Sequence, residues 1–348
     1  MDKKYMQRCL DLAKIGLGNT YSNPMVGSVI VHQGKIIGEG FHHKAGEPHA
    51  EVNAVNSVKD KSLLTESTLY VNLEPCAHFG KTPPCSLLIK ESKIPKVVIG
   101  CTDTFSKVAG KGIEMLKEAG VDITVGVLEE ESRELNKRFF TFHEKKRPYV
   151  ILKWAQTLDG FIDMDRTEEN YGQPTWITND FAKKLVHKWR SEEQSILVGT
   201  NTAIKDNPSL TTREWSGNNP TRILIDRQGR VPESHHLFDG SVNTIVFTEQ
   251  EKVDKENLQY IKINFNENII TQILQELYKA NLQSVIIEGG KQVLQSFIDS
   301  NYWDEARVFI GDKLFGKGVD APSVNAEIQI QEEVGNSKLC FYRNNGAK

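Results

Sequence analysis

The sequence predicts an α/β protein made of two domains, and three observations support this prediction. The chain has 348 residues, which is enough for about two domains of ordinary size. In both halves, short apolar runs of strand length alternate with amphipathic segments of helix length. The alternation is interrupted once, at residues 144–148, where a charged run ends in a proline. We therefore predict one domain over residues 1–145 and a second over residues 146–348.

The first domain is predicted to be a three-layer α/β domain. Its strands are short apolar runs, the first two joined by a hairpin turn, and its helices have apolar residues at helical spacing. The expected strands are residues 26–31, 36–40, 67–73, 96–100 and 122–126, and the expected helices are residues 5–15, 49–58, 85–92, 112–119 and 129–143.

The second domain is predicted to be another α/β domain with its own sheet. A polar segment without periodicity, residues 163–173, and a segment rich in polar groups, residues 202–213, are expected to be loops. The expected strands are residues 149–154, 194–199, 221–225, 244–247, 284–288 and 307–310, and the expected helices are residues 179–191, 269–280 and 292–299.

Charge and composition exclude several classes of function. A net charge of −3 argues against a general nucleic-acid binder, and no apolar run approaches the roughly 20 residues of a membrane span. The five cysteines are odd in number and unevenly spread, and the first residues lack the pattern of an export signal. Free thiols and a metal site are therefore expected rather than disulfides, in a cytoplasmic protein.

Four residues of the first domain form a pattern typical of a catalytic zinc site. His49 begins a predicted helix, and Cys76 and Cys85 each follow a proline. One histidine and two cysteines leave the fourth zinc position to water, whose pKa the metal lowers towards about 7. Glu51, two residues after His49, is the candidate for proton transfer. We predict a hydrolytic deaminase site that removes an exocyclic amine from a nitrogen heterocycle.

The spacing of the two cysteines narrows the substrate. Zinc nucleobase deaminases carry the pattern H-x-E…P-C-x-x-C, whereas here Cys85 follows Cys76 by nine residues. The intervening loop carries His78 and Lys81, which we interpret as a holder for an anionic group such as a phosphate. Asn23, just before the first predicted strand, is a candidate to hydrogen-bond the substrate base. The remaining cysteines are interpreted as structural: Cys9, Cys101 and Cys340.

These motifs together resemble the deaminase of riboflavin biosynthesis, over residues 22–27, 45–52 and 73–85 and further at Asp103 and residues 108–112. The resemblance implies a cytidine-deaminase-like fold and deamination of 2,5-diamino-6-ribosylamino-4(3H)-pyrimidinone 5′-phosphate. It implies zinc ligation by His49, Cys76 and Cys85, with Glu51 as the proton shuttle. It also implies contacts to base, ribose or phosphate from Asn23, His42, His78 and Lys81.

The second domain lacks the G-x-G-x-x-G of a dinucleotide-binding Rossmann unit. Residues 311–317 spell most of a P-loop, but Gly318 stands where Ser or Thr is required, so we reject that motif. The order of its motifs instead resembles the reductase half of the bifunctional riboflavin-biosynthesis family, a dihydrofolate-reductase-like fold that uses NADPH. The matching pieces are Lys153 and residues 157–160, 176–178, 195–199, 206–213, 225–226 and 288–290.

The resemblance also implies roles for residues of the second domain. Lys153 and Glu288 are the candidates for proton handling while the ribosyl group is reduced to ribityl. The substrate phosphate would be held by Arg190, Leu210, Arg213 and Glu288. NADPH would lie along Ala155, Trp176, Thr202, Asp206, Gly290, Lys291, Gln292, Val293, Leu294, Gln295 and Ser296. The family further implies a homo-oligomer.

Two departures from the family pattern bear on the reductase site. The segment 163–175 is longer than usual, and Pro174 stands near a serine expected to touch the substrate. Trp154 replaces a small residue and is expected to narrow the nicotinamide pocket.

We consider three functions for a chain with these residues. The first is a bifunctional enzyme, a zinc hydrolase and an NADPH-dependent oxidoreductase, acting on a small-molecule pyrimidine ribosyl phosphate to give 5-amino-6-ribitylamino-uracil 5′-phosphate. The second is a transfer-RNA or nucleoside deaminase with an accessory domain, which the acidic balance and the long loop between the cysteines disfavour. The third is a non-catalytic NADPH- or nucleotide-binding regulator, which the intact zinc pattern disfavours.

Overall fold

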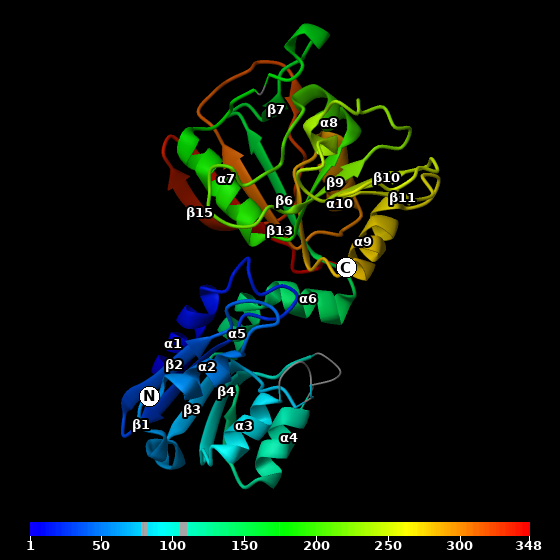
Figure 1. Cartoon of the computed structure of the whole chain (residues 1–348). Coiled ribbons are helices and arrows are strands. Elements are labelled where there is room, and N and C mark those ends of the chain that lie inside the picture. Colours follow the sequence, from blue (N-terminus) through cyan, green and yellow to red (C-terminus); the bar gives the residue numbers. More distant parts are fainter. Residues whose placement is uncertain (78, 80–82, 105–109, 174) are drawn as a thin grey trace. The chain divides into compact units, whose positions relative to one another are not determined.

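The computed structural model of the chain contains two compact units, Met1–Lys145 and Lys146–Lys348 (Figure 1). It describes residues 1–77, 79, 83–104, 110–173 and 175–348. Each unit is built from one main sheet and its helices, and each is described by itself. No helix among the residues described is long and apolar enough to cross a membrane.

The first unit has a five-stranded sheet in the order β2-β1-β3-β4-β5. β1 is antiparallel to both of its neighbours, and β3, β4 and β5 are parallel. The strands are β1 (Gly27–His32), β2 (Lys35–Phe41), β3 (Thr68–Leu73), β4 (Lys96–Cys101) and β5 (Asp122–Val125). The helices are α1 (Asp2–Lys14), α2 (Ala50–Ser57), η1 (Lys61–Glu66), α3 (Cys85–Glu91), α4 (Lys111–Glu118), α5 (Glu129–Leu135) and α6 (Lys137–Lys145).

Helices cover both faces of this sheet, which confirms the three-layer prediction. Successive strand residues point to opposite faces. Val29 packs with Met6 of α1 on one face, and Ile30 packs with Ala54 of α2 and Leu116 of α4 on the other. The carboxyl ends of the parallel strands and the starts of α2 and α3 therefore meet at one edge, where the candidate zinc ligands lie.

The single helix expected over residues 129–143 was wrong in one respect, because the structure divides it at Asn136. The Asn136 side chain accepts the N–H of Met25 at 2.8 Å and donates to the Met25 carbonyl at 2.9 Å. Asn72 binds the same segment, accepting from the N–H of Gly27 at 2.8 Å. Two buried asparagines thus fix the main chain that leads from Asn23 into β1, which a helical periodicity alone cannot indicate.

The second unit has a nine-stranded sheet in the order β11-β10-β9-β8-β12-β6-β13-β16-β15. The strands from β11 to β13 are parallel, and β16 and β15 add antiparallel pairs. The main-sheet strands are β6 (Tyr149–Gln156), β8 (Ser195–Gly199), β9 (Thr221–Ile225), β10 (Thr244–Thr248), β11 (Leu258–Lys262), β12 (Ser284–Ile287), β13 (Glu305–Ile310), β15 (Ile328–Val334) and β16 (Ser337–Arg343).

Helices lie on both faces of this second sheet. Ile196 packs with Val186 of α7 on one face, and Leu197 packs with Ile273 of α9 and Phe297 of α10 on the other. The helices are α7 (Asp180–Glu192), η2 (Glu168–Asn170), α8 (Thr200–Asp206), η3 (His236–Phe238), α9 (Ile269–Lys279) and α10 (Lys291–Asp299), and β7 (Phe161–Asp163) pairs with β14 (Val319–Asp320). The loop expected from residue 202 was wrong in its first part, because α8 occupies it.

Candidate functional site

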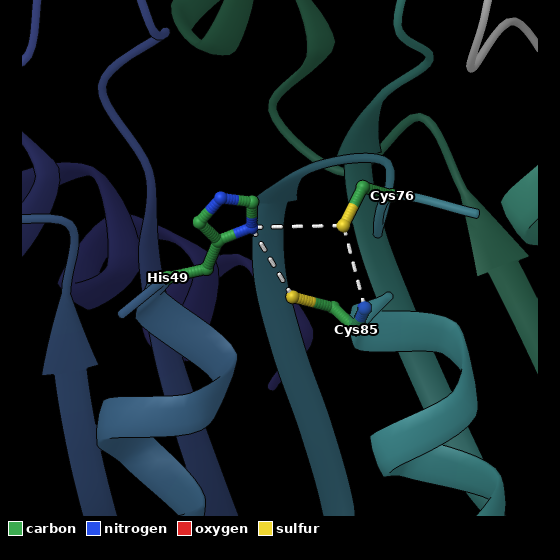
Figure 2. Close-up of side chains that lie close together, drawn as sticks. All are labelled: His49, Cys76 and Cys85. Atoms are coloured by element: carbon green, nitrogen blue, oxygen red, sulfur yellow. Dashed lines mark hydrogen bonds between the residues drawn. The ribbon is translucent and has the colours of Figure 1, made fainter. Parts of the chain in front are cut away.

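Three side chains of the first unit converge on a common point (Figure 2). His49 precedes α2, Cys76 follows β3 and Cys85 begins α3. His49 Nδ1 lies 3.6 Å from Cys76 Sγ and 3.4 Å from Cys85 Sγ, and all three donor atoms lie within 4.8 Å of one another. In a tetrahedral zinc site, ligand nitrogen and sulfur atoms are about 3.6 Å apart. The donor set therefore fits zinc and leaves a fourth position for water.

Hydrogen bonding favours the thiolate form of Cys76, which is the form that binds a cation. The thiol of Cys85 donates towards Cys76, as do the His49 ring and the Cys85 main-chain N–H at 3.3 Å, and these donors lower the pKa of Cys76. The same contact with Cys76, together with burial, raises the pKa of Cys85. A bound metal ion would favour loss of the thiol proton of Cys85 as well, since metal ions bind cysteine as the thiolate.

Glu51 lies in the first turn of α2, two residues after His49, and only 3% of it is exposed. Burial, followed by the negative charge of the Cys76 sulfur, raises the pKa of Glu51 to about 7. A carboxyl group with a pKa near neutrality can both accept and donate a proton. The position and the chemistry of Glu51 therefore suit proton transfer beside the metal site.

The structure brings two of the predicted substrate residues to the same place. The ring of His42 lies edge-on to that of His49, with centroids 5.4 Å apart. Asn23 reaches His42, with 3.1 Å between Asn23 Nδ2 and His42 Nε2. His78 and Lys81 lie outside the described residues.

Glu74 is a buried residue that the sequence analysis missed. Its Oε2 accepts the main-chain N–H groups of Asp103 (3.2 Å) and Gly110 (3.1 Å), and its Oε1 accepts those of Gly112 (3.0 Å) and Ile113 (3.4 Å). The signal was a carboxylate directly before the Pro-Cys pair at the end of an apolar strand. Its four bonds hold the start of α4 against the segment that carries Cys76.

Replacing Glu74 by Gln is expected to lower the stability of the first unit. The amide NH₂ would face two N–H donors, so two charge-assisted hydrogen bonds are lost, at a cost on the order of 3 kcal/mol. For a domain of this size the melting temperature would fall by about 10 °C. Thermal unfolding measures this, with Asp60→Asn as the matched control. Asp60 is exposed and accepts one N–H, from Ser62 at 3.0 Å; equal shifts for both variants would contradict the prediction.

A second cluster of charged side chains lies at the carboxyl ends of β6 and β12. Arg190 Nη2 lies 2.8 Å from Glu288 Oε2, and Lys153 Nζ lies 3.7 Å from Glu288 Oε1. Burial opposes ionisation of Glu288, but the charges of Arg190 and Lys153 prevail and lower its pKa to about 2. Burial lowers the pKa of Lys153, against the attraction of Glu288. Glu288 Oε1 is buried, and apart from the ion pair with Lys153 it has no hydrogen-bond partner in the described part of the chain.

The loop after α8 is tied to this cluster. Arg190 Nη1 donates to the Thr211 carbonyl at 3.3 Å, beside Leu210, which is buried with φ of +52°. Arg213, further along, is exposed. His187, one turn before Arg190 on α7, was missed by the sequence analysis; burial, followed by Arg190 and Arg213, lowers its pKa to about 4.

A glycine-lined cradle lies beside the cluster, where β8 and β12 end. A Cβ at Gly290 would lie 3.2 Å from Thr202 Oγ1, and Cβ atoms at Gly199 and Gly289 would lie 2.8 and 2.7 Å from Val293. Gly290 is the N-cap of α10, and the main-chain N–H groups at the start of a helix favour phosphate. The cradle therefore suits the phosphates of a dinucleotide, at the sheet edge where parallel α/β folds bind ligands.

The other residues predicted to line the cofactor have varied surroundings. Ala155 lies on β6, Lys291, Gln292 and Gln295 lie on α10, and Trp176 is half exposed. Leu294 is buried in the core, and the Ser296 hydroxyl donates to the Gln292 carbonyl of its own helix. Asp206 ends α8 and pairs with Arg166 at 2.7 Å.

Both departures from the family pattern, the long segment 163–175 and Trp154, belong to the second unit. Arg166 lies 2.9 Å from Asp163 and also binds Asp206, which anchors the long segment to α8. Pro174 lies outside the described residues. Trp154 packs in the apolar core of the second unit and donates to Gln156 at 2.8 Å.

Comparisons with known proteins agree with this division of chemistry. A family model described as the cytidine and deoxycytidylate deaminase zinc-binding region matches residues 1–101, and one described as the RibD C-terminal domain matches residues 148–340. The riboflavin biosynthesis protein RibD of Aquifex aeolicus is 42% identical, over 99% of this chain and 98% of its own. That of Escherichia coli is 34% identical, over 90% of this chain and 89% of its own.

Solved structures of related proteins are similar to this chain over nearly its whole length. A diaminohydroxyphosphoribosylaminopyrimidine deaminase/5-amino-6-(5-phosphoribosylamino)uracil reductase from Thermotoga maritima has a TM-score of 0.89 and 38% identity, covering 98% of both chains. RibD of Acinetobacter baumannii has a TM-score of 0.88 and 31% identity, again over 98% of both chains.

A zinc-type deaminase unit and a reductase unit on one chain define a bifunctional enzyme, as the site geometry and the two family models both indicate. The cytidine-deaminase-like and dihydrofolate-reductase-like folds expected from the sequence are confirmed. The chain belongs to the riboflavin biosynthesis protein RibD family. It is a deaminase and reductase of riboflavin biosynthesis whose cofactors are Zn²⁺ and NADPH.

Proposed function

We propose that this chain carries out two consecutive steps on one ribosylated pyrimidine phosphate. The first unit deaminates 2,5-diamino-6-ribosylamino-4(3H)-pyrimidinone 5′-phosphate. The second reduces the ribosyl group to ribityl and gives 5-amino-6-ribitylamino-uracil 5′-phosphate. The name of the Thermotoga maritima relative, which this chain matches over 98% of its length, supports these substrates. The single observation that carries the deaminase half is the convergence of His49, Cys76 and Cys85 beside the buried Glu51.

In the deamination step, His49, Cys76 and Cys85 would hold zinc, which would supply Lewis-acid activation of water. Glu51 would accept a proton from the attacking water on its carboxylate and pass protons to the ring nitrogen and to the departing amine. Water is consumed and ammonia leaves, so a C–N bond is replaced by a C=O bond. Asn23 contacts the substrate, and we propose His78 and Lys81 as holders of its phosphate.

In the reduction step, Thr202 and residues 290–296 would hold NADPH, with Ala155, Trp176 and Asp206 completing its site, and the cofactor would supply a hydride for C1 of the ribosyl group. As the bond between C1 and the ring oxygen breaks, Lys153 Nζ would donate a proton to that oxygen, and Glu288 would accept a substrate hydroxyl. Arg190, Leu210 and Arg213 hold the phosphate end of the substrate. The support is the buried Lys153–Glu288–Arg190 cluster beside the cradle.

Two further proposals concern the oligomeric state of the protein and its location in the cell. We propose a homo-oligomer, as the family resemblance implies, and a cytoplasmic enzyme. Light scattering on the purified chain tests the first of these.

The experiment that tests the proposed function is product analysis with and without NADPH. The zinc-loaded protein should release ammonia from the diamino substrate without NADPH, and should oxidise NADPH only once the deaminated intermediate is present. Deamination of cytidine or RNA, but not of the pyrimidine phosphate, would favour a nucleoside or transfer-RNA deaminase. NADPH binding without turnover of either substrate would favour a non-catalytic regulator.

A further inference from the structure

His42 is a buried side chain whose two ring nitrogens both have partners within the protein. Only 2% of His42 is exposed, and it follows β2 next to the zinc-ligand segment. Its Nδ1 lies 3.1 Å from the carbonyl oxygen of Pro48, and its Nε2 lies 3.1 Å from Nδ2 of Asn23. Neither nitrogen is left to bind a ligand.

The partners of His42 decide where its proton lies. A carbonyl oxygen only accepts, so Nδ1 carries the hydrogen and donates to Pro48. The atom of Asn23 that faces Nε2 at 3.1 Å is the amide nitrogen Nδ2, which donates, so Nε2 is the acceptor and carries no hydrogen.

The orientation of the Asn23 amide has a consequence for recognition. With Nδ2 bound to His42, Oδ1 points away from it and has no hydrogen-bond partner among the residues that the structure describes. The main chain around Asn23 is fixed, because the Asn23 N–H donates to Thr20 at 2.7 Å and Asn136 binds Met25. The free oxygen is thus a preset acceptor beside the metal site.

We infer that His42 is a positioning residue that turns Asn23 so that its carbonyl oxygen, a hydrogen-bond acceptor, meets an N–H or O–H donor of the substrate. This inference rests on the proposed deaminase function of the first unit. Because both ring nitrogens of His42 bind protein groups, His42 acts through Asn23 in this inference, in place of the direct substrate contact that the family resemblance implies for it. A neutral His42 with its hydrogen on Nδ1 selects a substrate that offers a donor at this point, and disfavours one that offers only an acceptor.

Two amide variants separate this role from a general structural one. In His42→Gln the amide oxygen reaches the position of Nε2 and still accepts from Asn23. In His42→Asn the shorter amide reaches only the position of Nδ1, so Asn23 loses its partner. We expect His42→Gln to keep kcat/KM of deamination within about threefold and His42→Asn to lose at least about tenfold, mainly through KM. Equal losses in the two variants would overturn the inference.

A double-mutant cycle tests whether His42 acts through Asn23. On an Asn23→Ala background, His42→Asn should cause no further loss, because the group that it positions is already absent. An additive loss would overturn the inference. Zinc content and the reductase activity of the second unit are measured in every variant, so that loss of metal or of folding is separated from loss of positioning.

A spectroscopic readout needs no turnover and so separates this inference from the proposed function. Nitrogen-15 NMR of the histidine side chains in the full-length protein should show His42 protonated at Nδ1 and bare at Nε2. The opposite tautomer, or a doubly protonated ring at neutral pH, would overturn the inference even if deamination is found. A wild-type protein with the expected tautomer but no deamination would instead overturn the proposed function.

Discussion

Replacing Glu51 by Gln is expected to reduce deamination by roughly 10³-fold, the usual contribution of a positioned general acid–base group. Gln has nearly the same shape but cannot carry a proton between water, ring nitrogen and leaving amine. Because Glu51 is buried and its pKa is already raised to about 7, a neutral amide costs the fold little. The zinc ligands are unchanged, so one zinc per chain should remain bound.

The measurement is ammonia release from the diamino substrate, with metal content determined on the same sample. Glu47→Gln is the matched control, because Glu47 is exposed and lies two residues before His49 rather than two after it. The second unit serves as an internal control: NADPH oxidation with the already deaminated intermediate should be unchanged. Deamination within tenfold of wild type by a fully zinc-loaded Glu51→Gln protein would reject Glu51 as the proton shuttle.

Much of the fold was predictable because its central strands are short apolar runs with clear ends. Residues 221–225 match β9 at both ends, and residues 149–154 lie within β6. The strand β15 was not predicted, because it lies at an edge of the sheet and is almost wholly exposed, so its apolar content is low. The strands β11 and β16 were also missed, although both contain apolar residues. In β15 the alternation of Ile328 and Ile330 with polar residues was the signal that could have been used.

The short helix α8 was missed for a different reason. Its first residues, Thr200-Asn201-Thr202, have poor intrinsic helix propensity. The structure nevertheless forms a helix there, because Gly199 ends β8 and the buried Ala203 packs under the sheet. Tertiary packing overrides local propensity at this point, and one sequence does not reveal it.

The residues of the two sites also fall into some that the sequence predicts and others that it does not. His49, Cys76 and Cys85 were predictable because few residue types bind zinc and their spacing is distinctive. Glu74 and His187 were not, because their roles depend on groups that only the fold brings near: four main-chain N–H groups for Glu74 and two guanidinium groups for His187. Side chains that act through other protein groups leave no motif of their own.

The buried charge cluster of the second unit leads to the other large expected effect. In Arg190→Met, Glu288 loses its 2.8 Å partner and keeps only Lys153 at 3.7 Å. Removing one member of a buried ion pair costs about 3 kcal/mol. For a domain of about 200 residues this lowers the melting temperature by roughly 9 °C. Reductase activity should fall by at least about 10²-fold, since a positioned charge contact is lost with it.

The loss of stability caused by Arg190→Met should depend on pH in a definite direction. Arg190 holds the pKa of Glu288 down at about 2, so the pair stabilises the fold above the ordinary carboxyl pKa, and this stability is lost as the pH falls towards 2. Without Arg190 the buried carboxyl has a higher pKa and is protonated earlier on acidification. The difference in stability between wild type and Arg190→Met should therefore be largest at pH 7 and should narrow as the pH is lowered to 4.

Two further substitutions separate the stability effect from the catalytic one. In Lys153→Met/Arg190→Met/Glu288→Gln all three charges of the cluster are gone, so that Lys153 is not left without its counter-charge; most of the lost stability should return while reductase activity stays low. Thermal unfolding and NADPH oxidation measure the two properties, and deamination by the first unit should be unchanged throughout. If the triple variant is no more stable than Arg190→Met, then the cost arises from the lost packing and the Thr211 contact of Arg190, and the buried charge of Glu288 is not its cause.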